Sequence, residues 1–342
     1  MVLRWARNHL SAFGWLIVAA LLLPAAARAD ESVLETSAVR FLPADGAFFV
    51  SFLRNRQQYE AFVESNAFAH WKKIGYARKM LEEIENEGGW QKFQQAQNDP
   101  MMGPIVKLVL DGVSNEVFLY GGIEYTDVIG SLQQLSLAVN TAQFRALVSG
   151  GRPEQAQLQA MLDFVKDLPD EANVPPTLIG FRISDGGNAK GLLNQLDQMA
   201  QQMAQVQPMF QGRVERKKFG QGDYVTLRLD GSMIPWDEVE DEFPGDASDF
   251  EKLKAKLEKK TLLAAVGIYD NYLLIYFGAD ASTLQKLGSG PSLASRPEFA
   301  KVRPVAHQPI TMLSYVSDDY MKRAANPANQ VQQLASIANS VL

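Results

Sequence analysis

The chain alternates short apolar runs with longer polar stretches that carry apolar residues at helical spacing, and this alternation constrains the fold most. The runs are rich in aromatic and β-branched residues, which favour strands. They lie at residues 47–53, 117–122, 177–183, 262–278 and 310–316, and two further strand-like runs with polar residues lie at 213–219 and 224–229. Within LLAAVGIYDNYLLIYFG (262–278), Asp270-Asn271 suits a tight turn because both residue types tolerate positive φ. The pattern predicts an α+β fold of mainly antiparallel sheets covered by helices.

Two stretches indicate an internal repeat. SNAFAHWKKI contains Phe68-Ala69 and SRPEFAKVRP contains Phe299-Ala300, and each pair precedes a His or Lys, an apolar residue and a base. Each stretch follows a predicted strand and helix. We therefore predict internally repeated strand–helix units, with the two phenylalanines packing in equivalent helices.

The predicted units group into two similar lobes, residues 30–170 and 171–342. Their boundary falls at LPDEANVPP, which Pro169, Pro175 and Pro176 punctuate. The last predicted helix carries an apolar stripe that runs to the final residue. Either this helix docks on the core, or the chain is truncated at Leu342 relative to a longer natural protein.

The first 29 residues have the form of a signal peptide. A basic start precedes the 12-residue apolar run AFGWLIVAALLL, and Ala27-Arg28-Ala29 fits the small-x-small cleavage pattern. A retained anchor is the alternative, but a membrane span needs about 20 apolar residues. We expect cleavage between Ala29 and Asp30, export to the periplasm or the extracellular space, and no stable membrane insertion afterwards.

Charge and cysteine content narrow the function further. The leader holds three of the 33 basic residues and none of the 39 acidic ones, so the mature chain has 30 against 39, a net charge of −9. Such a chain repels phosphate backbones, which disfavours nucleic acid as a partner. The chain has no cysteine, which excludes disulfides, thiol catalysis and thiolate metal sites. Neither a phosphate-binding glycine motif nor a histidine metal motif occurs, so no cofactor or metal is expected.

One stripe of apolar residues could describe a ligand site. Its members recur at steps of three and four residues and contain flexible methionines, which suit pockets for varied apolar groups but equally suit a core. The stripe consists of Leu192, Leu196, Met199, Met203, Val206 and Phe210.

The segment WDEVEDEFPGDASDFE contains eight carboxylates and no base. It lacks the alternating pattern of a calcium loop, so a solvated loop is the simplest interpretation and protein capture an alternative. The residues of this candidate interaction loop are Asp237, Glu238, Glu240, Asp241, Glu242 and Asp246.

Scattered carboxylates leave a hydrolase open as an alternative. Asp127, Asp185 and Asp230 lie in different segments that folding could bring together, and paired carboxylates can perform acid–base catalysis. A cleft with two carboxylates, one of raised pKa, would favour this alternative.

The segments LPADGAFFVSF, EVFLYGG, PTLIGFRISD and GDYVTLRLDGSMIPWDE resemble a family of exported bacterial proteins of unknown function. The resemblance covers residues 41–320 and implies a signal peptide, an LPAD-type opening and repeated strand–helix units. It implies no catalytic or binding residues. The sequence therefore favours a soluble, non-enzymatic protein that binds a ligand or a partner in the cell envelope, with a hydrolase or an envelope scaffold as alternatives.

Overall fold

The computed structural model describes residues 32–75, 79, 89–99, 103–153, 156–157, 159–160, 163–164, 173–184, 186–243 and 247–324. The expected leader with its cleavage site, most of the expected lobe boundary and the C-terminal apolar stripe lie outside these residues. Among the described residues, no helix is long and apolar enough to cross a membrane.

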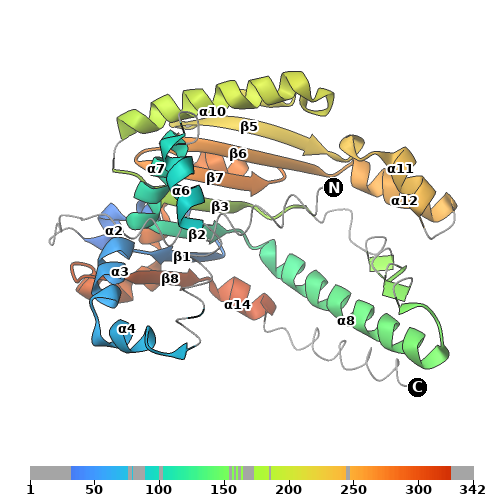
Figure 1. The fold of residues 1–342 in the computed structure, drawn as a ribbon, viewed down its shortest axis with the longest axis horizontal. Coiled ribbons are helices and arrows are strands. Elements are labelled where there is room, and N and C mark those ends of the chain that lie inside the picture. Colours follow the sequence, from blue (N-terminus) through green and yellow to red (C-terminus); the bar gives the residue numbers. More distant parts are fainter. Residues whose placement is uncertain are drawn as a thin grey trace.

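The strands form one eight-stranded sheet (Figure 1). Its order is β4-β5-β6-β7-β3-β2-β1-β8, and every neighbouring pair is antiparallel. The predicted α+β class and antiparallel pairing are thus confirmed. The strands are β1 (Phe48–Phe52), β2 (Val117–Gly121), β3 (Thr177–Arg182), β4 (Val214–Phe219), β5 (Gly222–Asp230), β6 (Thr261–Tyr269), β7 (Tyr272–Gly278) and β8 (Met312–Val316).

The predicted hairpin at residues 262–278 is confirmed. Strands β6 and β7 pair from Tyr269 opposite Tyr272, and Asp270 in the turn has φ 53°. That positive φ is the conformation that Asp and Asn accept more readily than other residues with a side chain.

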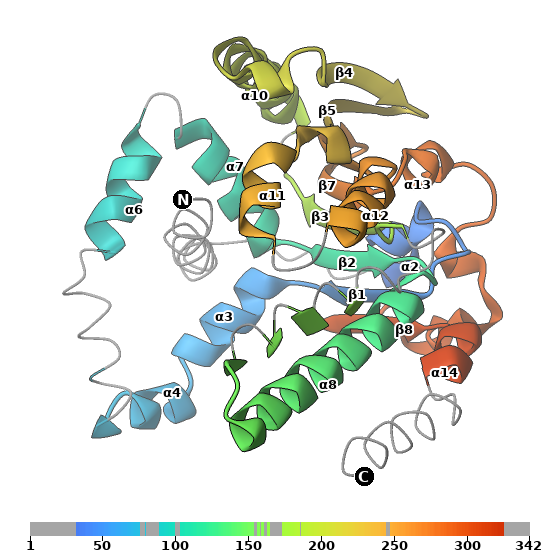
Figure 2. The same ribbon diagram turned by 90° about the vertical axis from the view of Figure 1, so that its right-hand side faces the viewer.

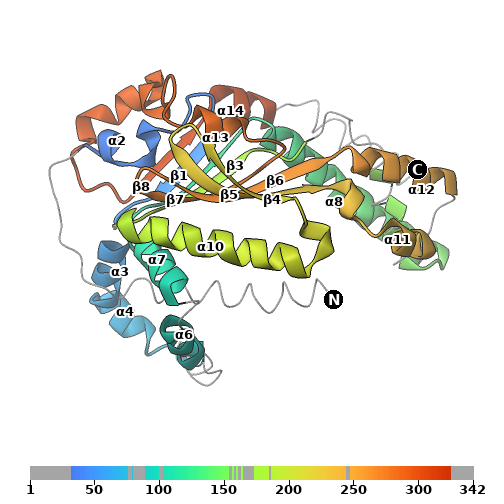
Figure 3. The ribbon, with the colours of Figure 1, turned by 90° about the horizontal axis from the view of Figure 1, so that it is seen from above.

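Helices cover both faces of the sheet, because side chains that alternate along each strand make both faces apolar. On one face, α7 (Gly103–Ser114) and α10 (Gly186–Val206) pack on residues such as Leu273 and Ile268. On the other, Phe118, Tyr272 and Tyr276 belong to a larger core. Figure 3 shows these two layers on either side of the sheet. The second layer contains α2 (Val33–Thr36), α13 (Ser282–Lys286) and the 3₁₀ helices η1 (Ala38–Arg40), η4 (Leu293–Ser295) and η5 (Pro297–Lys301).

Of the remaining helices, α6 packs against α7 and α3 against α4, and Figures 1 and 2 show the long α8 extending away from the sheet. These helices are α3 (Asn55–Val63), α4 (Asn66–Trp71), α6 (Gly89–Asn98), α8 (Tyr125–Ser149), η2 (Pro208–Phe210), η3 (Gly231–Met233), α11 (Trp236–Glu242), α12 (Ala247–Glu258), η6 (Arg303–Val305) and α14 (Asp318–Ala324).

The sheet does not support the predicted repeat. Phe68 lies on the α-helix α4 and stacks locally on Trp71, whereas Phe299 is buried on the 3₁₀ helix η5 against Tyr315. The preceding strands differ as well, since β1 lies next to the edge strand β8 while β7 lies in the middle.

The two predicted lobes likewise share one sheet. Strands β2 and β3, from opposite sides of the expected boundary, pair over the full length of β2. The two-lobe division therefore stays a prediction from sequence.

Alanine substitution at two glycines is expected to change the stability of the protein in opposite directions. A Cβ at Gly180 in β3 would collide with the buried ring of Phe118, whereas one at Gly191, on the exposed side of α10, meets nothing. We expect Gly180→Ala to lower the free energy of unfolding by about 1–3 kcal/mol, as overpacking does. Gly191→Ala should raise it by about 0.5–1 kcal/mol because alanine favours the helix. Urea unfolding monitored by circular dichroism measures both, and equal effects would contradict this packing.

Candidate functional site

The predicted apolar stripe lies on α10 and η2, and its two halves have different surroundings. Leu192 is buried between α10 and the sheet, and Leu196 and Met199 are half-buried. Further along, Met203 and Val206 are 54% and 80% exposed, and Phe210 on η2 is half-buried. The first half of the stripe is therefore core, while the second half is largely open to solvent.

Beneath the second half lies a cavity of about 260 Å³, here called the apolar groove. Leu196, Met203 and Phe210 line it from above, and β5, β6 and β7 form its floor. The floor includes Val225, Ala264, Ala265, Val266, Ile275 and Phe277. Ala200 on the helix and Ala264 on the sheet have short side chains, which leaves room between the layers. Met199 and Val206 do not line the groove, so the structure brings half of the predicted stripe together at one site.

The acidic segment is not the loop that the sequence suggests, because residues 236–242 form helix α11. Trp236 anchors it: the ring is buried, meets Phe250 edge to face, and donates a hydrogen bond from Nε1 to the Gly231 carbonyl at 2.9 Å. Carboxylates in a first helical turn are also favoured by the helix dipole. Asp237 and Glu240 are exposed. The side chains of Glu238, Asp241 and Glu242, and all of Asp246, lie outside the described residues.

The carboxylates proposed for a hydrolase do not form a described pair. Asp127 is exposed on α8, and Asp185 lies outside the described residues. Asp230 pairs with Arg213 and accepts hydrogen bonds from Ser232, and the Arg213 guanidinium lowers the pKa of that carboxyl to about 2. A general acid needs the opposite shift. No described group of three His, Asp or Glu residues is placed to hold a metal ion.

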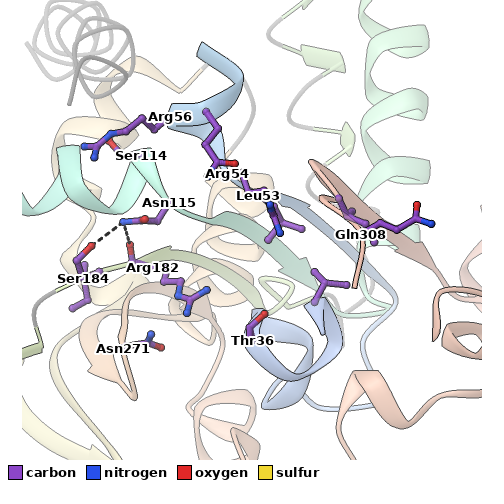
Figure 4. Close-up of a pocket in the computed structure, with 14 residues that line it drawn as sticks. Thr36, Leu53, Arg54, Arg56, Ser114, Asn115, Arg182, Ser184, Asn271 and Gln308 are labelled. Carbon is purple, nitrogen blue, oxygen red and sulfur yellow. Dashed lines mark hydrogen bonds between the residues drawn. The ribbon is translucent and has the colours of Figure 1, made fainter. Parts of the chain in front are cut away.

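A second cavity, of about 420 Å³, opens where β1 and β3 end and β2 begins. Arg54, Arg56 and Arg182 line it, so it is called the arginine pocket here (Figure 4). Neutral polar side chains surround them, and the described lining contains no carboxylate. The neutral polar residues are Thr36, Gln57, Ser114, Asn115, Ser184, Asn271 and Gln308. Three arginines, two at the start of α3 and one at the end of β3, thus line the same cavity.

Hydrogen bonds hold part of this pocket in place. Asp111 accepts from the Ser184 amide at 2.6 Å, from its hydroxyl at 2.8 Å and from Asn115 Nδ2 at 3.2 Å. The Ile183 amide donates to the Asn271 carbonyl at 2.9 Å. These bonds fix the segment after β3 against α7 and against the β6–β7 turn, so one wall of the pocket is preorganised.

A buried carboxyl group lies behind the pocket. Glu116 is 1% exposed, and it accepts hydrogen bonds from Ser51 Oγ at 2.8 Å, Tyr272 Oη at 2.6 Å and the Ala38 amide at 3.1 Å. Burial raises the pKa of Glu116 above its ordinary value, although these bonds and the charge of Arg182 act in the opposite direction. Glu116 thus links strands and the loop layer through one satisfied buried group.

The arginine pocket was missed by sequence reasoning because its residues come from distant segments. The chain matches no protein-family model, no curated protein and no solved structure. The resemblance to exported bacterial proteins therefore remains an expectation, and the site has to be interpreted from its own chemistry.

The raised pKa of Glu116 predicts a pH dependence of stability. A carboxyl group whose pKa rises on folding stabilises the fold most below its ordinary pKa of 4.5, and this contribution is lost as the pH rises through the folded value. Glu116→Gln cannot ionise and keeps an acceptor oxygen for Ser51 and Ala38. We expect the free energy of unfolding of this variant, relative to wild type, to increase as the pH rises above 4.5.

Glu298→Gln is the matched control. Arg296 lowers the pKa of the Glu298 carboxyl from its ordinary value of 4.5, so the relative stability of this variant should decrease as the pH rises toward 4.5 and change little above it. Urea unfolding at several pH values measures both differences, and parallel trends for the two variants would contradict the assignment.

Proposed function

We propose that the mature chain is an exported, non-enzymatic protein of the cell envelope that binds a small apolar ligand, such as an acyl chain. The observation that carries this proposal is the apolar groove under α10, where thirteen lining residues belong to the described part of the chain and only Thr226 among them is polar. Ligand pockets are concave and mostly apolar. The groove has that character, and methionine at its edge can adapt to ligands of varied shape.

The exposed apolar groups give such a ligand a physical reason to bind. Met203 is 54% exposed and Phe277 is 38% exposed, although both belong to the lining. Covering a large apolar side chain fully is favourable by about 1.5–3 kcal/mol. A chain of methylene groups laid between α10 and the sheet would remove both residues from water.

Export rests on the leader pattern in the sequence, and the leader lies outside the described residues. An envelope location agrees with the absence of cysteine and with the net negative charge of the mature chain. The hydrolase alternative gains no support from Asp230, whose pKa is lowered. For the scaffold alternative, Asp237 and Glu240 on α11 are exposed to solvent. Their exposure alone does not favour binding of a partner protein.

A first test asks whether a ligand is already bound. Residues 30–342, produced with the natural leader and purified from a bacterial periplasm without detergent, should show by native mass spectrometry an added mass that denaturation removes. The extracted compound should be apolar or amphiphilic. Failure of the chain to reach the periplasm would contradict export. A mass equal to that of the chain alone would contradict a tightly held lipid.

A second test uses two methionines of similar exposure. Met203 lines the groove, whereas Met209 is 48% exposed and does not line it. We expect Met203→Asp to weaken binding of a fluorescent fatty acid by about tenfold or more, because it replaces apolar contact with a charge. Met209→Asp should bind as the wild type does. Equal affinities for wild type and both variants would place the ligand elsewhere.

A further inference from the structure

The arginine pocket combines positive charge with a size beyond that of a simple ion site. It has a volume of about 420 Å³, within the range of small-molecule sites. Arg54, Arg56 and Arg182 are all half-buried. Charges at partly buried positions interact more strongly with a ligand than charges in open water do.

Two of these arginines have no described acidic partner. Neither Arg54 nor Arg182 forms an ion pair with any carboxylate in the described part of the chain. The carboxylates nearest in the network already accept bonds from neutral groups: Asp111 from Ser184 and Asn115, and Glu116 from Ser51 and Tyr272. Because burial raises the pKa of Glu116, its ability to neutralise Arg182 is reduced.

Some other arginines of the protein differ from Arg54 and Arg182, because they pair with carboxylates. Arg216 forms a bidentate pair with Asp223, at 3.1 Å and 2.7 Å, and Arg296 pairs in the same way with Glu298. A further cavity of about 620 Å³ contains Arg213 and Lys217, which pair with Asp230 and Glu215. In these four pairs the positive charge is compensated from within the chain, which is the ordinary structural use of arginine. Arg228, which also lines the larger cavity, is exposed and has no described ion pair.

Arg54 also occupies an unusual backbone conformation. It is the N-cap of α3 with φ 56° and ψ 36°, a left-handed region that disfavours residues with a side chain, and its side chain forms no cap hydrogen bond. Strained residues cluster at binding sites, where the surrounding structure holds them. Here the conformation begins α3 directly at the pocket, which Arg54 lines.

We propose that the arginine pocket binds a small phosphomonoester. The guanidinium fork matches phosphate oxygens in a bidentate geometry and remains charged at all relevant pH values. A bare phosphate is small for this cavity, and the neutral donors and acceptors of Asn115, Ser184, Asn271 and Gln308 suit the hydroxyl groups of a polyol or sugar. The net negative charge of the chain disfavours polyanionic nucleic acid but does not prevent binding of one phosphate within a locally positive cavity.

Calorimetric titration of the mature chain tests the proposal, with a hexose phosphate, the unphosphorylated hexose and inorganic phosphate as probes. The hexose phosphate should bind, increasing salt should weaken it, and the neutral hexose should not bind. Inorganic phosphate should bind more weakly than the hexose phosphate because it lacks the polar contacts. Failure of both phosphorylated and inorganic probes to bind at millimolar concentration would overturn the proposal.

Three variants separate the site from the fold. Arg182→Gln and Arg54→Gly should each weaken hexose phosphate binding about ten- to hundredfold, the effect of losing a charged hydrogen bond. Arg54→Gly relieves the left-handed strain, so its melting temperature should equal or exceed that of the wild type, and lost binding then cannot be attributed to unfolding. Arg216→Gln is the control, because that arginine lies outside the pocket and should leave affinity unchanged. Undiminished binding by Arg182→Gln and Arg54→Gly, or equal loss with Arg216→Gln, would overturn the assignment.

Met203→Asp distinguishes this site from the apolar groove. If the two sites are separate, this variant should lose fatty-acid binding and retain hexose phosphate binding. If no fatty acid binds in the apolar groove, the arginine pocket can still be tested with hexose phosphate, and the reverse also holds. Loss of both ligands in the well-folded variant would contradict two independent sites.

Discussion

The alternation of apolar side chains across one antiparallel sheet is the constraint on which the rest of the structure depends. Directly opposed residues in neighbouring strands point to the same face, and one such row runs through Val225, Val266, Ile275, Ile179 and Leu119. Because this row crosses five strands, burying it requires helices along much of the sheet. The second face is equally apolar and is covered by the short helices around η1 and η5.

Both candidate sites lie where the layer of helices over the sheet leaves room or where the strands end. The apolar groove lies where α10 passes over β5–β7 with short side chains between the layers. The arginine pocket lies at the strand ends, where backbone direction reverses and polar groups must be satisfied. The fold thus determines the different chemistry of the two sites: the apolar face supplies one lining, and the turns at the sheet end supply the other.

Local pattern was enough to predict the elements, but it was not enough to predict their assembly. The strand runs, the Asp270-Asn271 turn and the helical stripe on α10 follow from neighbours in sequence, and each is present. Strand order depends on long-range pairing such as β1 with β8, which joins Phe48 to Val316 and Phe52 to Met312. The helix at α11 was missed because its cause is the packing of Trp236 on Phe250, which acidic composition conceals.

The same reasoning explains why the predicted stripe contains three lining residues of the apolar groove, whereas no sequence pattern indicated the arginine pocket. Periodicity places six residues on one side of a helix but does not show where the opposing layer becomes thinner. The thinner place becomes visible only in the structure, where the short side chain of Ala264 lies opposite Ala200 in the groove lining. Arg54 stands two residues after the end of β1 in SFLRN, and Arg182 is the last residue of β3 in GFRIS. That shared position is a signal, but it becomes informative only once β1 and β3 are known to lie in one sheet, separated by β2.

Strand β7 runs between the two sites, so its length sets the distance between them. Asn271 lines the arginine pocket before this strand begins, and Phe277 lines the apolar groove near its far end. Six residues of extended chain span about 20 Å. Substitutions at such a separation, without a shared partner, usually have additive effects. Communication between two bound ligands would therefore need a second arrangement of β7 or its neighbours, and β7 is hydrogen-bonded on both sides, to β3 and β6. A strand fixed in this way favours two sites that fill independently, and the Met203 and Arg182 variants address each site without disturbing the other.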